Sequence, residues 1–443
     1  MEEMDVQLVV FDLDGTLIGA SMDFTEIKRK LRNKLLEEGI PEELIGDLTP
    51  MYETLVQISQ KTGISFEHLH SFLVNLEVER SKESYLFEGA RELLEFLKDK
   101  GLKLALMTRS SRKATEFTLK KHKIKEFFNL IITRDDVSWK DVKPNNGHLK
   151  VILDYFRIPS TKVVVVGDHG YDLIPAKALG TLSVLITSNE SGRMSFKIDE
   201  EATFEVKTIK EAIDLFKRLL NTYVVVPAYN EEKTIGNVLE DLLKYFKEKE
   251  IIVVNDGSKD RTKEIAIEKG VVVLSHLVNR GLGGALGTGI RYALLKGAEI
   301  IITFDADGQH LVEDALKVMK PVIEGKADFA IGSRLKGDIS QMPFVKKIGN
   351  FALDFITFIF AKNYIADSQS GLRCLNRQCA SKIKITCDRY AVSSEILIEA
   401  SRHKCKIIEV PIRAIYTEYT KKKGTNVLEG VKIAFNLLLD KLR

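Results

Sequence analysis

The chain has 443 residues, which is more than one domain usually holds, so we expect two domains. Hydrophobic residues make up 44% and charged residues 29%, a balance that excludes a disordered or collagen-like chain. Lys and Arg number 66 against 63 Asp and Glu, and the resulting charge of +3 gives no support to a nucleic-acid partner.

The cysteines, the N-terminus and the hydropathy pattern bear on localisation. The four cysteines form no C-x-x-C pair, which favours a reducing compartment over a zinc ribbon or a disulfide framework. Three of the first five residues are acidic, and the segment leads directly into a strand, so we expect no signal peptide. No window of 18 apolar residues occurs, so no membrane-spanning helix is expected. These features favour a cytoplasmic protein.

Continuous apolar runs alternate with helical patterns along the chain. Each run is followed within a few residues by Gly, Asp or Asn, as expected for strands that are buried on both faces. The runs cover residues 8–11, 104–107, 163–166, 224–226, 251–254 and 300–302. The alternation predicts an α/β fold with two Rossmann-like domains in tandem, each a doubly wound parallel sheet with crossover helices.

The pattern restarts near residue 221, where a helical stretch ends and a new strand begins at Tyr223. We therefore expect a first domain at residues 1–220 and a second at 221–443, joined without a flexible linker. Within the first domain, a segment at about residues 19–85 interrupts the alternation of strands and helices, and we call it the helical insert. It has helical patterns over residues 24–38, 50–61 and 66–80. The insert is a candidate cap over the strand ends.

The first predicted strand ends in two aspartates, Asp12 and Asp14, followed by Gly15. Catalytic groups collect at the carboxyl ends of parallel strands, and carboxylates at i and i+2 can face one pocket. One of them can attack phosphorus and form an acyl-phosphate, while the other serves as general acid and then base. The same pattern also occurs as a turn or a metal-binding loop, so the pair alone leaves these alternatives open.

Three further strand ends carry residue types that a phosphatase needs. Thr108 offers a hydroxyl for a phosphate oxygen, and Lys143 offers a cation for the nucleophile and the phosphate. Asp168 and Asp172 offer carboxylates for a hard divalent cation. The four segments together resemble the haloacid dehalogenase superfamily of phosphatases over residues 5–220. The insert is similar to the cap of its phosphoglycolate-phosphatase branch.

This resemblance implies a role for each residue and a phosphomonoester substrate. Asp12 would be the nucleophile and Asp14 the general acid and base. The implied Mg²⁺ site consists of Asp12, Asp14, Asp168 and Asp172, and the implied phosphate ligands are Thr108 and Lys143. We interpret His68 and His70 of the insert as surface or packing residues.

The second half opens with a strand at residues 224–226 and a loop that contains Pro227, Tyr229 and Glu231. We expect Pro227 to stop the strand. A short loop with an aromatic side chain and carboxylates can cradle a nucleobase, although a plain strand-turn-helix has the same pattern. Asp256 lies just beyond the next strand and can accept from a base imide or a ribose hydroxyl.

Asp305, Asp307 and Gln309 follow the strand at residues 300–303 and predict a second metal site. Their spacing supplies oxygen ligands that suit Mg²⁺ or Mn²⁺ bridging a diphosphate. Such a cation would neutralise charge on a departing nucleoside diphosphate. Arg334 ends another strand-like run.

The order of these motifs resembles the family-2 glycosyltransferases, in particular the polyprenyl-phosphate sugar synthase branch, over about residues 222–420. The resemblance implies a glycosyltransferase-A-type fold, a nucleoside-diphosphate sugar as donor and a polyprenyl phosphate as acceptor. The implied base, ribose, metal and phosphate contacts are Asp256, Asp305, Asp307 and Arg334, with Gln309 near the metal. The competing interpretation, a nucleotidyltransferase, needs a Gly-rich basic loop after the first strand, and residues 227–231 do not form one.

The sequence gives weaker indications of the residues that bind the acceptor. Transfer to an alcohol needs a general base, whereas a phosphate monoester is already anionic at neutral pH. Asp367 is the best candidate for a base, Arg373 is a candidate for holding an acceptor phosphate, and Glu395 is a further candidate on this side. The weak base signal favours a phosphorylated acceptor.

Two stretches bear on membrane binding. Residues 351–361 are apolar but too short to span a bilayer, and residues 427–442 form a predicted amphipathic helix preceded by Lys421–Lys423. Apolar faces flanked by lysines suit the surface of an anionic membrane. Packing of both stretches against the sheet or a second subunit is the alternative.

We therefore predict a bifunctional enzyme in the cytoplasm and peripheral on the membrane. A magnesium-dependent phosphatase is joined to a glycosyltransferase that uses Mg²⁺ or Mn²⁺. One alternative is a soluble transferase that acts on a phosphorylated metabolite, whose product the first domain dephosphorylates. Another is a first domain that only regulates the transferase, against which the intact Asp12, Asp14, Lys143 and Asp168 argue.

Overall fold

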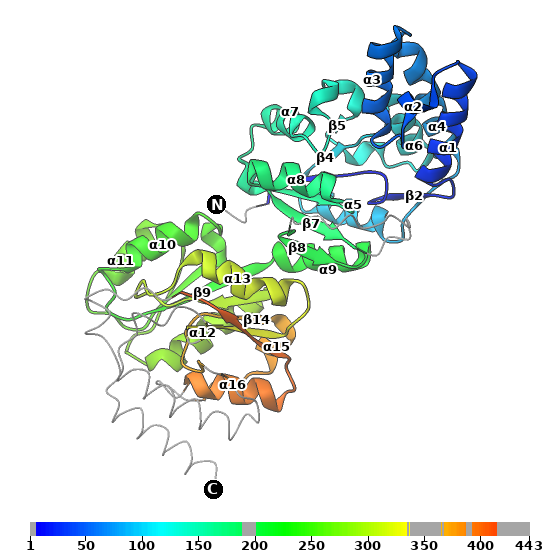
Figure 1. Ribbon diagram of the computed structural model, residues 1–443. Coiled ribbons are helices and arrows are strands. Elements are labelled where there is room, and N and C mark those ends of the chain that lie inside the picture. Colours follow the sequence, from blue (N-terminus) through cyan, green and yellow to red (C-terminus); the bar gives the residue numbers. More distant parts are fainter. Residues whose placement is uncertain are drawn as a thin grey trace. The chain divides into compact units, whose positions relative to one another are not determined.

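The computed structural model describes residues 6–187, 201–334, 336, 365, 367–386 and 392–413. Contacts divide the chain into two compact units, Val6–Asp214 and Leu215–Arg443, with the division inside helix α9 (Ile209–Leu219) (Figure 1). The domain boundary that we expected at residue 221 stays a prediction. Among the described helices, none combines the length and the apolar composition that crossing a membrane requires.

A six-stranded parallel sheet forms the centre of the first unit, in the order β5-β4-β1-β6-β7-β8. Because every neighbouring pair is parallel, the carboxyl ends of all six strands lie at one edge. The strands are β1 (Leu8–Phe11), β4 (Lys103–Met107), β5 (Leu130–Ile132), β6 (Val163–Gly167), β7 (Leu182–Ile186) and β8 (Phe204–Val206). The crossover helices are α5 (Ala90–Asp99), α6 (Arg112–Lys121), α7 (Gly147–Phe156) and α8 (Gly170–Leu179).

The helical insert separates two short antiparallel strands, β2 (Ile18–Ala20) and β3 (Ser84–Leu86). Its helices are α1 (Phe24–Glu37), α2 (Glu42–Ile45), α3 (Met51–Thr62) and α4 (Phe66–Lys82). The side chain of Asp23 accepts from the backbone N–H of Glu26 and begins α1, and Ser65 does the same for His68 at the start of α4. The insert has its own core, to which Ile27, Leu31, Leu55 and Leu73 belong.

A seven-stranded sheet forms the second unit, in the order β11-β10-β9-β12-β14-β13-β15. Its strands are β9 (Thr222–Ala228), β10 (Ile251–Asn255), β11 (Val272–Ser275), β12 (Ile300–Thr303), β13 (Phe329–Ser333), β14 (Arg373–Asn376) and β15 (Ile407–Pro411). Its helices are α10 (Ile235–Leu243), α11 (Thr262–Glu268), α12 (Gly281–Leu295), α13 (Val312–Ile323), α15 (Arg377–Lys382) and α16 (Val392–Arg402).

Strand β14 runs antiparallel to both β12 and β13, so this sheet is mixed and the expectation of a wholly parallel sheet was wrong here. The reversal has a structural consequence. Because β14 begins where β12 ends, the loop at residues 367–372 that precedes β14 reaches the carboxyl edge of the sheet.

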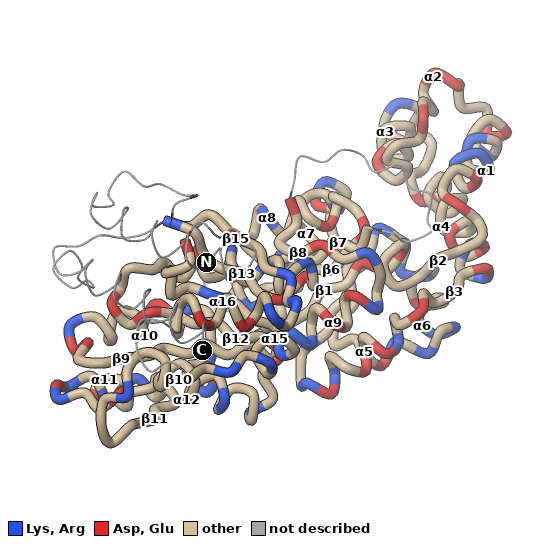
Figure 2. Tube along the Cα trace, turned by 90° about the horizontal axis from the view of Figure 1, so that it is seen from below, with Lys and Arg blue, Asp and Glu red and all other residues tan. Residues whose placement is uncertain are grey.

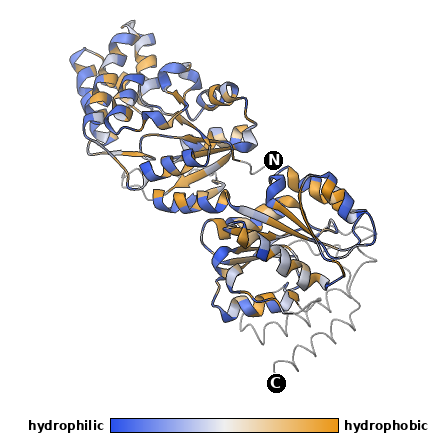
Figure 3. Ribbon diagram, turned by 180° about the vertical axis from the view of Figure 1, so that it is seen from behind, coloured by the Kyte–Doolittle hydropathy of each residue, from blue (hydrophilic) through white to orange (hydrophobic). Residues whose placement is uncertain are grey.

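In both units the strands are hydrophobic and the exposed faces of the helices are hydrophilic (Figure 3). Acidic and basic residues are interspersed over each unit (Figure 2).

The expectation that Pro227 stops the first strand of this sheet was also wrong, because β9 continues through Pro227 to Ala228. The carbonyl of Val225 accepts from Phe304 N, so Val225 faces β12, and Pro227 two residues on faces the same side. The pairing with β12 ends at Val225. Pro227 therefore lies where no ladder hydrogen bond requires its missing N–H.

Candidate active sites

The acidic residues predicted at the strand ends of the first unit form one cluster. Asp12 follows β1, and Asp168 and Asp172 follow the neighbouring strand β6. Each offers a carboxylate oxygen, and the three oxygens lie within 4.8 Å of one another. In the described part of the chain, no other group of three His, Cys, Asp or Glu side chains has such spacing. Three carboxylates fit a hard divalent cation such as Mg²⁺.

Lys143 brings a positive charge to Asp12 and Asp172 of this cluster. Its Nζ donates to Asp12 Oδ1 at 2.6 Å, to Asp172 Oδ1 at 2.7 Å and to the carbonyl of Met107 at 3.0 Å. Burial opposes its charge, but Asp12 and Asp172 hold the pKa of Lys143 above its usual value. The lysine is therefore a fixed cation beside the Asp12 carboxylate.

The electrostatics of Asp12 fit a bound cation. Burial raises the pKa of Asp12 to about 7, and the charges of Asp172 and Asp168 add to this effect, while Lys143 opposes it. Repulsion from Asp172 and Asp168 thus disfavours the charged form of Asp12. A divalent cation held by the three carboxylates would offset this repulsion.

Gly15 allows Asp168 to approach the loop after β1. Its φ is +95°, and a Cβ built at this position would lie 2.1 Å from Asp168 Oδ2. Any other residue would therefore displace this carboxylate. Thr16 then bridges the two strand ends, because its hydroxyl lies 3.4 Å from Asp12 Oδ2 and 3.3 Å from Asp168 Oδ1.

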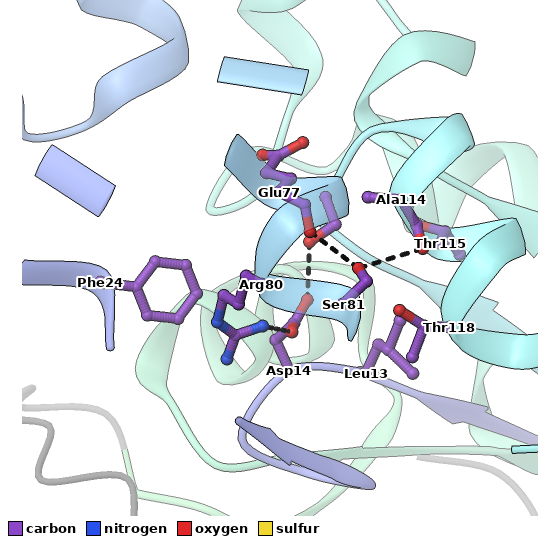
Figure 4. Close-up of a pocket in the computed structure, with 10 residues that line it drawn as sticks. Leu13, Asp14, Phe24, Glu77, Arg80, Ser81, Ala114, Thr115 and Thr118 are labelled. Carbon is purple, nitrogen blue, oxygen red and sulfur yellow. Dashed lines mark hydrogen bonds and ion pairs between the residues drawn. The ribbon is translucent and has the colours of Figure 1, made fainter. Parts of the chain in front are cut away.

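Asp14 is not one of the three clustered carboxylates, and it binds Arg80 and Ser110. Arg80, from the helical insert, pairs with Asp14 Oδ1, and the Ser110 hydroxyl donates to Asp14 Oδ2 at 2.6 Å. Figure 4 shows Arg80 turned toward Asp14 beside the ring of Phe24, at the border of a cavity of about 10 Å³. The side chain of Asp14 is thus outside the metal-ligand cluster, and its predicted metal role stays a prediction.

Two more ion pairs join the insert to the sheet of the same unit. Arg134 binds Glu77 of α4 with both Nη atoms, and both residues are buried. Arg109, which follows β4, donates to both carboxylate oxygens of Glu53 at 2.8 Å. Thr108 is buried at the end of β4 and accepts from Ser110 N at 3.1 Å. The insert is therefore bound to the segments that follow β4 and β5 at the carboxyl edge of the sheet.

In the second unit, Asp305 and Asp307 lie together beyond β12. Gln309 donates to Asp307 through its backbone N at 3.0 Å and its side-chain amide at 2.6 Å. Burial and the neighbouring Asp305 raise the pKa of Asp307. Burial acts in the same direction on Asp305, but the hydrogen bond from His310 and the charges of His310, Arg373 and Arg334 lower its pKa. Two close carboxylates of this kind fit a divalent cation.

Asp367, which is buried, and Arg334, which is partly buried, form an ion pair at this edge. Arg334 donates to Asp367 Oδ2 through its backbone N and its Nε, both at 2.8 Å, and to Oδ1 through an Nη at 2.7 Å. Both oxygens of Asp367 are therefore engaged. The base role that we expected for Asp367 stays a prediction, while this geometry suits a residue that positions Arg334.

Arg373 holds the loop at residues 367–372 in place. Its Nε donates to the carbonyl of Ser370 at 2.9 Å and an Nη to that of Ser368 at 3.0 Å. Burial lowers the pKa of Arg373 to about 10. Within this loop Gly371 touches Asp305, since a Cβ at Gly371 would lie 2.0 Å from Asp305 Oδ2. The loop therefore sets the position of Asp305.

Asp256 organises the start of α12. Its carboxylate accepts from Arg280 N at 2.9 Å and Gly281 N at 2.7 Å, and lies 2.6 Å from Nδ1 of His276. His276 Nε2 in turn lies 2.9 Å from the hydroxyl of Thr288. The predicted contact of Asp256 with a nucleobase or ribose stays a prediction.

The remaining predicted residues have different surroundings. Tyr229 is exposed beyond β9, whereas Glu231 is buried and accepts from the Thr234 hydroxyl at 3.1 Å. Glu395 accepts from the backbone N of Thr386 at 3.1 Å. The stretches at residues 351–361 and 421–442, which bore on membrane binding, lie outside the described residues.

Four residues at these sites were missed in the sequence: Arg80, His148, His276 and His310. His148 is buried and accepts from the backbone N of Lys143 through Nδ1. His310 lies only five residues beyond Asp305, so its spacing was a usable signal. Arg80 has no such signal, because only the packing of the insert brings it to Asp14.

Two family models match the chain. The model of glycosyl transferase family 2 matches residues 223–380, and that of the haloacid dehalogenase-like hydrolases matches residues 9–186. The solved structure of a haloacid dehalogenase-like family hydrolase from Streptococcus pneumoniae covers 48% of this chain and 99% of its own, with 20% identity and a TM-score of 0.37.

Two relatives match half of the chain. An uncharacterized protein of Methanocaldococcus jannaschii is 54% identical over 224 residues, which are 50% of this chain and 92% of that protein. The UDP-N-acetylglucosamine–dolichyl-phosphate N-acetylglucosaminyltransferase of Methanococcus voltae is 42% identical over 241 residues, which are 50% of this chain and 96% of that enzyme. The chain therefore belongs to the family-2 glycosyltransferases, and it carries in addition a haloacid dehalogenase-like hydrolase region.

Proposed function

We propose that the chain is a bifunctional enzyme. Its second unit transfers a sugar from a nucleoside-diphosphate sugar to a polyprenyl phosphate such as dolichyl phosphate, with Mg²⁺ or Mn²⁺. Its first unit hydrolyses a phosphomonoester with Mg²⁺. The observation that carries the transferase assignment is the match to nearly the whole Methanococcus voltae enzyme, whose name specifies UDP-N-acetylglucosamine and dolichyl phosphate. We therefore take that sugar nucleotide as the first donor to test.

The donor would bind at the carboxyl edge of the second sheet. Asp305, Asp307 and Gln309 would hold the cation, which neutralises charge on the leaving diphosphate. Arg334, fixed by Asp367, presents a guanidinium near Asp305 and would bind a phosphate oxygen. Pro227, Tyr229, Glu231 and Asp256 are assigned to the nucleotide.

The engaged state of Asp367 supports a phosphorylated acceptor. Arg334 donates three hydrogen bonds to its two oxygens, and this paired, charge-neutralised carboxylate is a weak base for a hydroxyl proton. A phosphate oxygen of the acceptor is anionic and can attack the anomeric carbon without a base. The bond from that carbon to the diphosphate breaks, and the electron pair leaves with the nucleoside diphosphate. Arg373 and Glu395 are assigned to the acceptor side, although both also hold neighbouring backbone.

The first unit has the groups for phosphoryl transfer through a covalent intermediate. Asp12 attacks phosphorus while Lys143 and Thr108 hold phosphate oxygens, and Asp14 protonates the leaving oxygen. Asp14 then takes a proton from the water that cleaves the aspartyl phosphate. Mg²⁺ between Asp12, Asp168 and Asp172 would offset the charge that gathers on the phosphoryl group. Before this sequence begins, Arg80 has to release Asp14, which supports a cap that opens.

The experiment is a donor panel with purified protein and polyprenyl phosphate in vesicles. We expect transfer from one nucleoside-diphosphate sugar in the presence of metal, and its loss with chelator. Asp307→Ala should reduce transfer about a hundredfold, whereas Asp241→Ala, a change of an exposed carboxylate on α10, should leave it unchanged. Transfer only to a water-soluble acceptor would contradict the lipid assignment. The phosphatase assignment would be contradicted if the protein binds phosphomonoesters without hydrolysing them and this binding changes the rate of sugar transfer.

A further inference from the structure

Two aliphatic side chains project into solvent from the loop between β11 and α12. Leu277 is 101% exposed and Val278 is 69% exposed. Large aliphatic side chains are usually buried, and two adjacent ones left in water form an apolar tip that a partner would cover. We call residues 277–278 the apolar tip.

The apolar tip lies at the edge of the sheet that carries the candidate donor site. Strand β11 is the margin of the sheet next to β10 (Figure 2) and runs parallel to it, so the loop after β11 leaves from the carboxyl edge. The backbone N–H groups of Arg280 and Gly281 at the end of the loop bind Asp256. The tip is therefore held next to a residue that we assign to the donor.

The base of the loop is anchored on both sides. His276 donates its backbone N–H to the carbonyl of Asn255 at 2.9 Å, and its ring contacts Asp256 and Thr288. The backbone of Val278 packs against Gly257, because a Cβ on that glycine would lie within 2.8 Å of it. The apolar tip is thus presented on a fixed support.

Exposed cations lie on the same edge. Arg280 follows the apolar tip directly, and Lys259 and Arg261 belong to the neighbouring loop that Gly257 begins. All three residues are exposed. Arg261 also lies 3.7 Å from Glu268. An apolar tip on an edge that carries exposed cations matches a bilayer interface, in which hydrocarbon lies below anionic headgroups.

We propose that Leu277 and Val278 insert into the membrane that carries the lipid acceptor. The inference rests on the proposed function, because a polyprenyl phosphate has its tail in the hydrocarbon and its phosphate at headgroup depth. Insertion of the apolar tip would hold the carboxyl edge of the sheet at the same depth. The sugar donor next to Asp256 would then meet the acceptor phosphate without the lipid leaving the bilayer.

The test is flotation with vesicles of phosphatidylcholine and phosphatidylglycerol. The variant Leu277→Asp/Val278→Asp should lower the vesicle-bound fraction about tenfold or more, since about 1.4 kcal/mol already gives a factor of ten. The matched control is Leu295→Asp, because Leu295 is 81% exposed at the other end of α12. The control should bind vesicles as the wild type does. Equal binding by the wild type and the double variant would overturn the proposal.

Depth is measured independently with a tryptophan probe. Trp139 is the only tryptophan, so a Trp139→Phe background allows Leu277→Trp and Leu295→Trp to be compared. Brominated lipids should quench the tryptophan at 277 and leave that at 295 unchanged. Equal quenching at both positions would contradict insertion of the tip. A different outcome would also overturn the proposal: the wild type is a dimer in solution, the double variant is a monomer, and both bind vesicles equally. The tip would then contact a second copy of the chain.

Failure of the inference is distinguishable from failure of the proposed function. With a short, water-soluble prenyl phosphate, the wild type and the double variant should transfer sugar at equal rates. In vesicles containing the long-chain acceptor, only the double variant should lose transfer, again about tenfold. If the wild type transfers to neither acceptor, the proposed function fails, while flotation and quenching still decide whether the tip inserts.

Discussion

His148 shows how one buried side chain supports the first site. It is fully buried and accepts the backbone N–H of Lys143, the residue that holds Asp12. Burial lowers the pKa of His148 to about 3, with the charges of Lys143 and Arg109 adding to the effect. The imidazole is therefore neutral at physiological pH and acts as an acceptor.

The lowered pKa of His148 predicts that the stability of the fold depends on pH. The unfolded histidine has a pKa of about 6.5, so between pH 6.5 and pH 3 the unfolded state binds a proton that the folded state does not. Stability from this residue is present above pH 6.5 and is lost as the pH falls, by up to about 1.4 kcal/mol per pH unit.

The measurement is urea unfolding of the wild type and of His148→Gln from pH 7 to pH 4. The amide of Gln retains an acceptor but does not titrate, so the wild type should lose stability more steeply than the variant. Parallel profiles would contradict the assignment of a buried, neutral His148.

Gly371 sets the position of Asp305 in the second site. In Gly371→Ala the new Cβ would meet the Asp305 carboxylate, which must then move. We expect about a tenfold loss in affinity for UDP with Mn²⁺, the usual scale when a neighbour of a metal ligand is disturbed. Calorimetry measures this, with Gly287→Ala as the control, because a Cβ there has only an ordinary contact with Ile385. An unchanged affinity would show that Asp305 is not a ligand.

The sequence allowed the strand-end residues to be predicted but not the residues that hold them. Asp12, Lys143 and Asp168 each follow a buried strand, and parallel strands bring their carboxyl ends together. Arg80 and His276 reach their sites from a helix and a loop whose packing no local pattern encodes. The pairing of Asp367 with Arg334 was likewise invisible, since 33 residues separate them.

At the scale of elements, helix α4 attaches the insert to the sheet through a buried ion pair. Glu77 of α4 binds Arg134, and its Oε2 also accepts from the backbone N of Ser111 at the start of α6. Arg134→Met would leave a buried carboxylate without its partner. We expect a loss of about 3–5 kcal/mol in the free energy of unfolding.

A double variant separates the charge from the packing. Glu77→Leu together with Arg134→Met removes both charges, so it should be clearly more stable than Arg134→Met alone. The free energy of unfolding of both variants is measured by urea unfolding, with the fluorescence of Trp139 as the signal of the first unit. If the double variant is as unstable as the single one, the ion pair is not what attaches α4.

The direction of β14 shows what an apolar run cannot encode. A strand buried on both faces has the same hydrophobic pattern whether it runs parallel or antiparallel to its neighbours. The alternation of strands and helices sufficed for α/β architecture in both units. It did not predict that β14 reverses and brings residues 367–372 to the edge where Asp305 lies.

At the scale of the whole molecule, each unit has its own sheet, its own core and its own acidic site. Each candidate site is built from side chains of its own unit, since Asp12 and Lys143 bond within the first unit and Asp305 and Asp307 within the second. This separation predicts that the two reactions fail independently when one site is damaged.

The most direct test is a crossed assay of two variants of the full chain. Asp12→Asn should reduce phosphomonoester hydrolysis in Mg²⁺ to background and leave sugar transfer to polyprenyl phosphate unchanged. Asp307→Ala should do the reverse, with transfer reduced about a hundredfold. Asp154→Asn, a change of an exposed carboxylate, should alter neither rate. Undiminished hydrolysis by Asp12→Asn, or loss of both activities in either variant while it remains folded, would contradict a bifunctional enzyme with two separate sites.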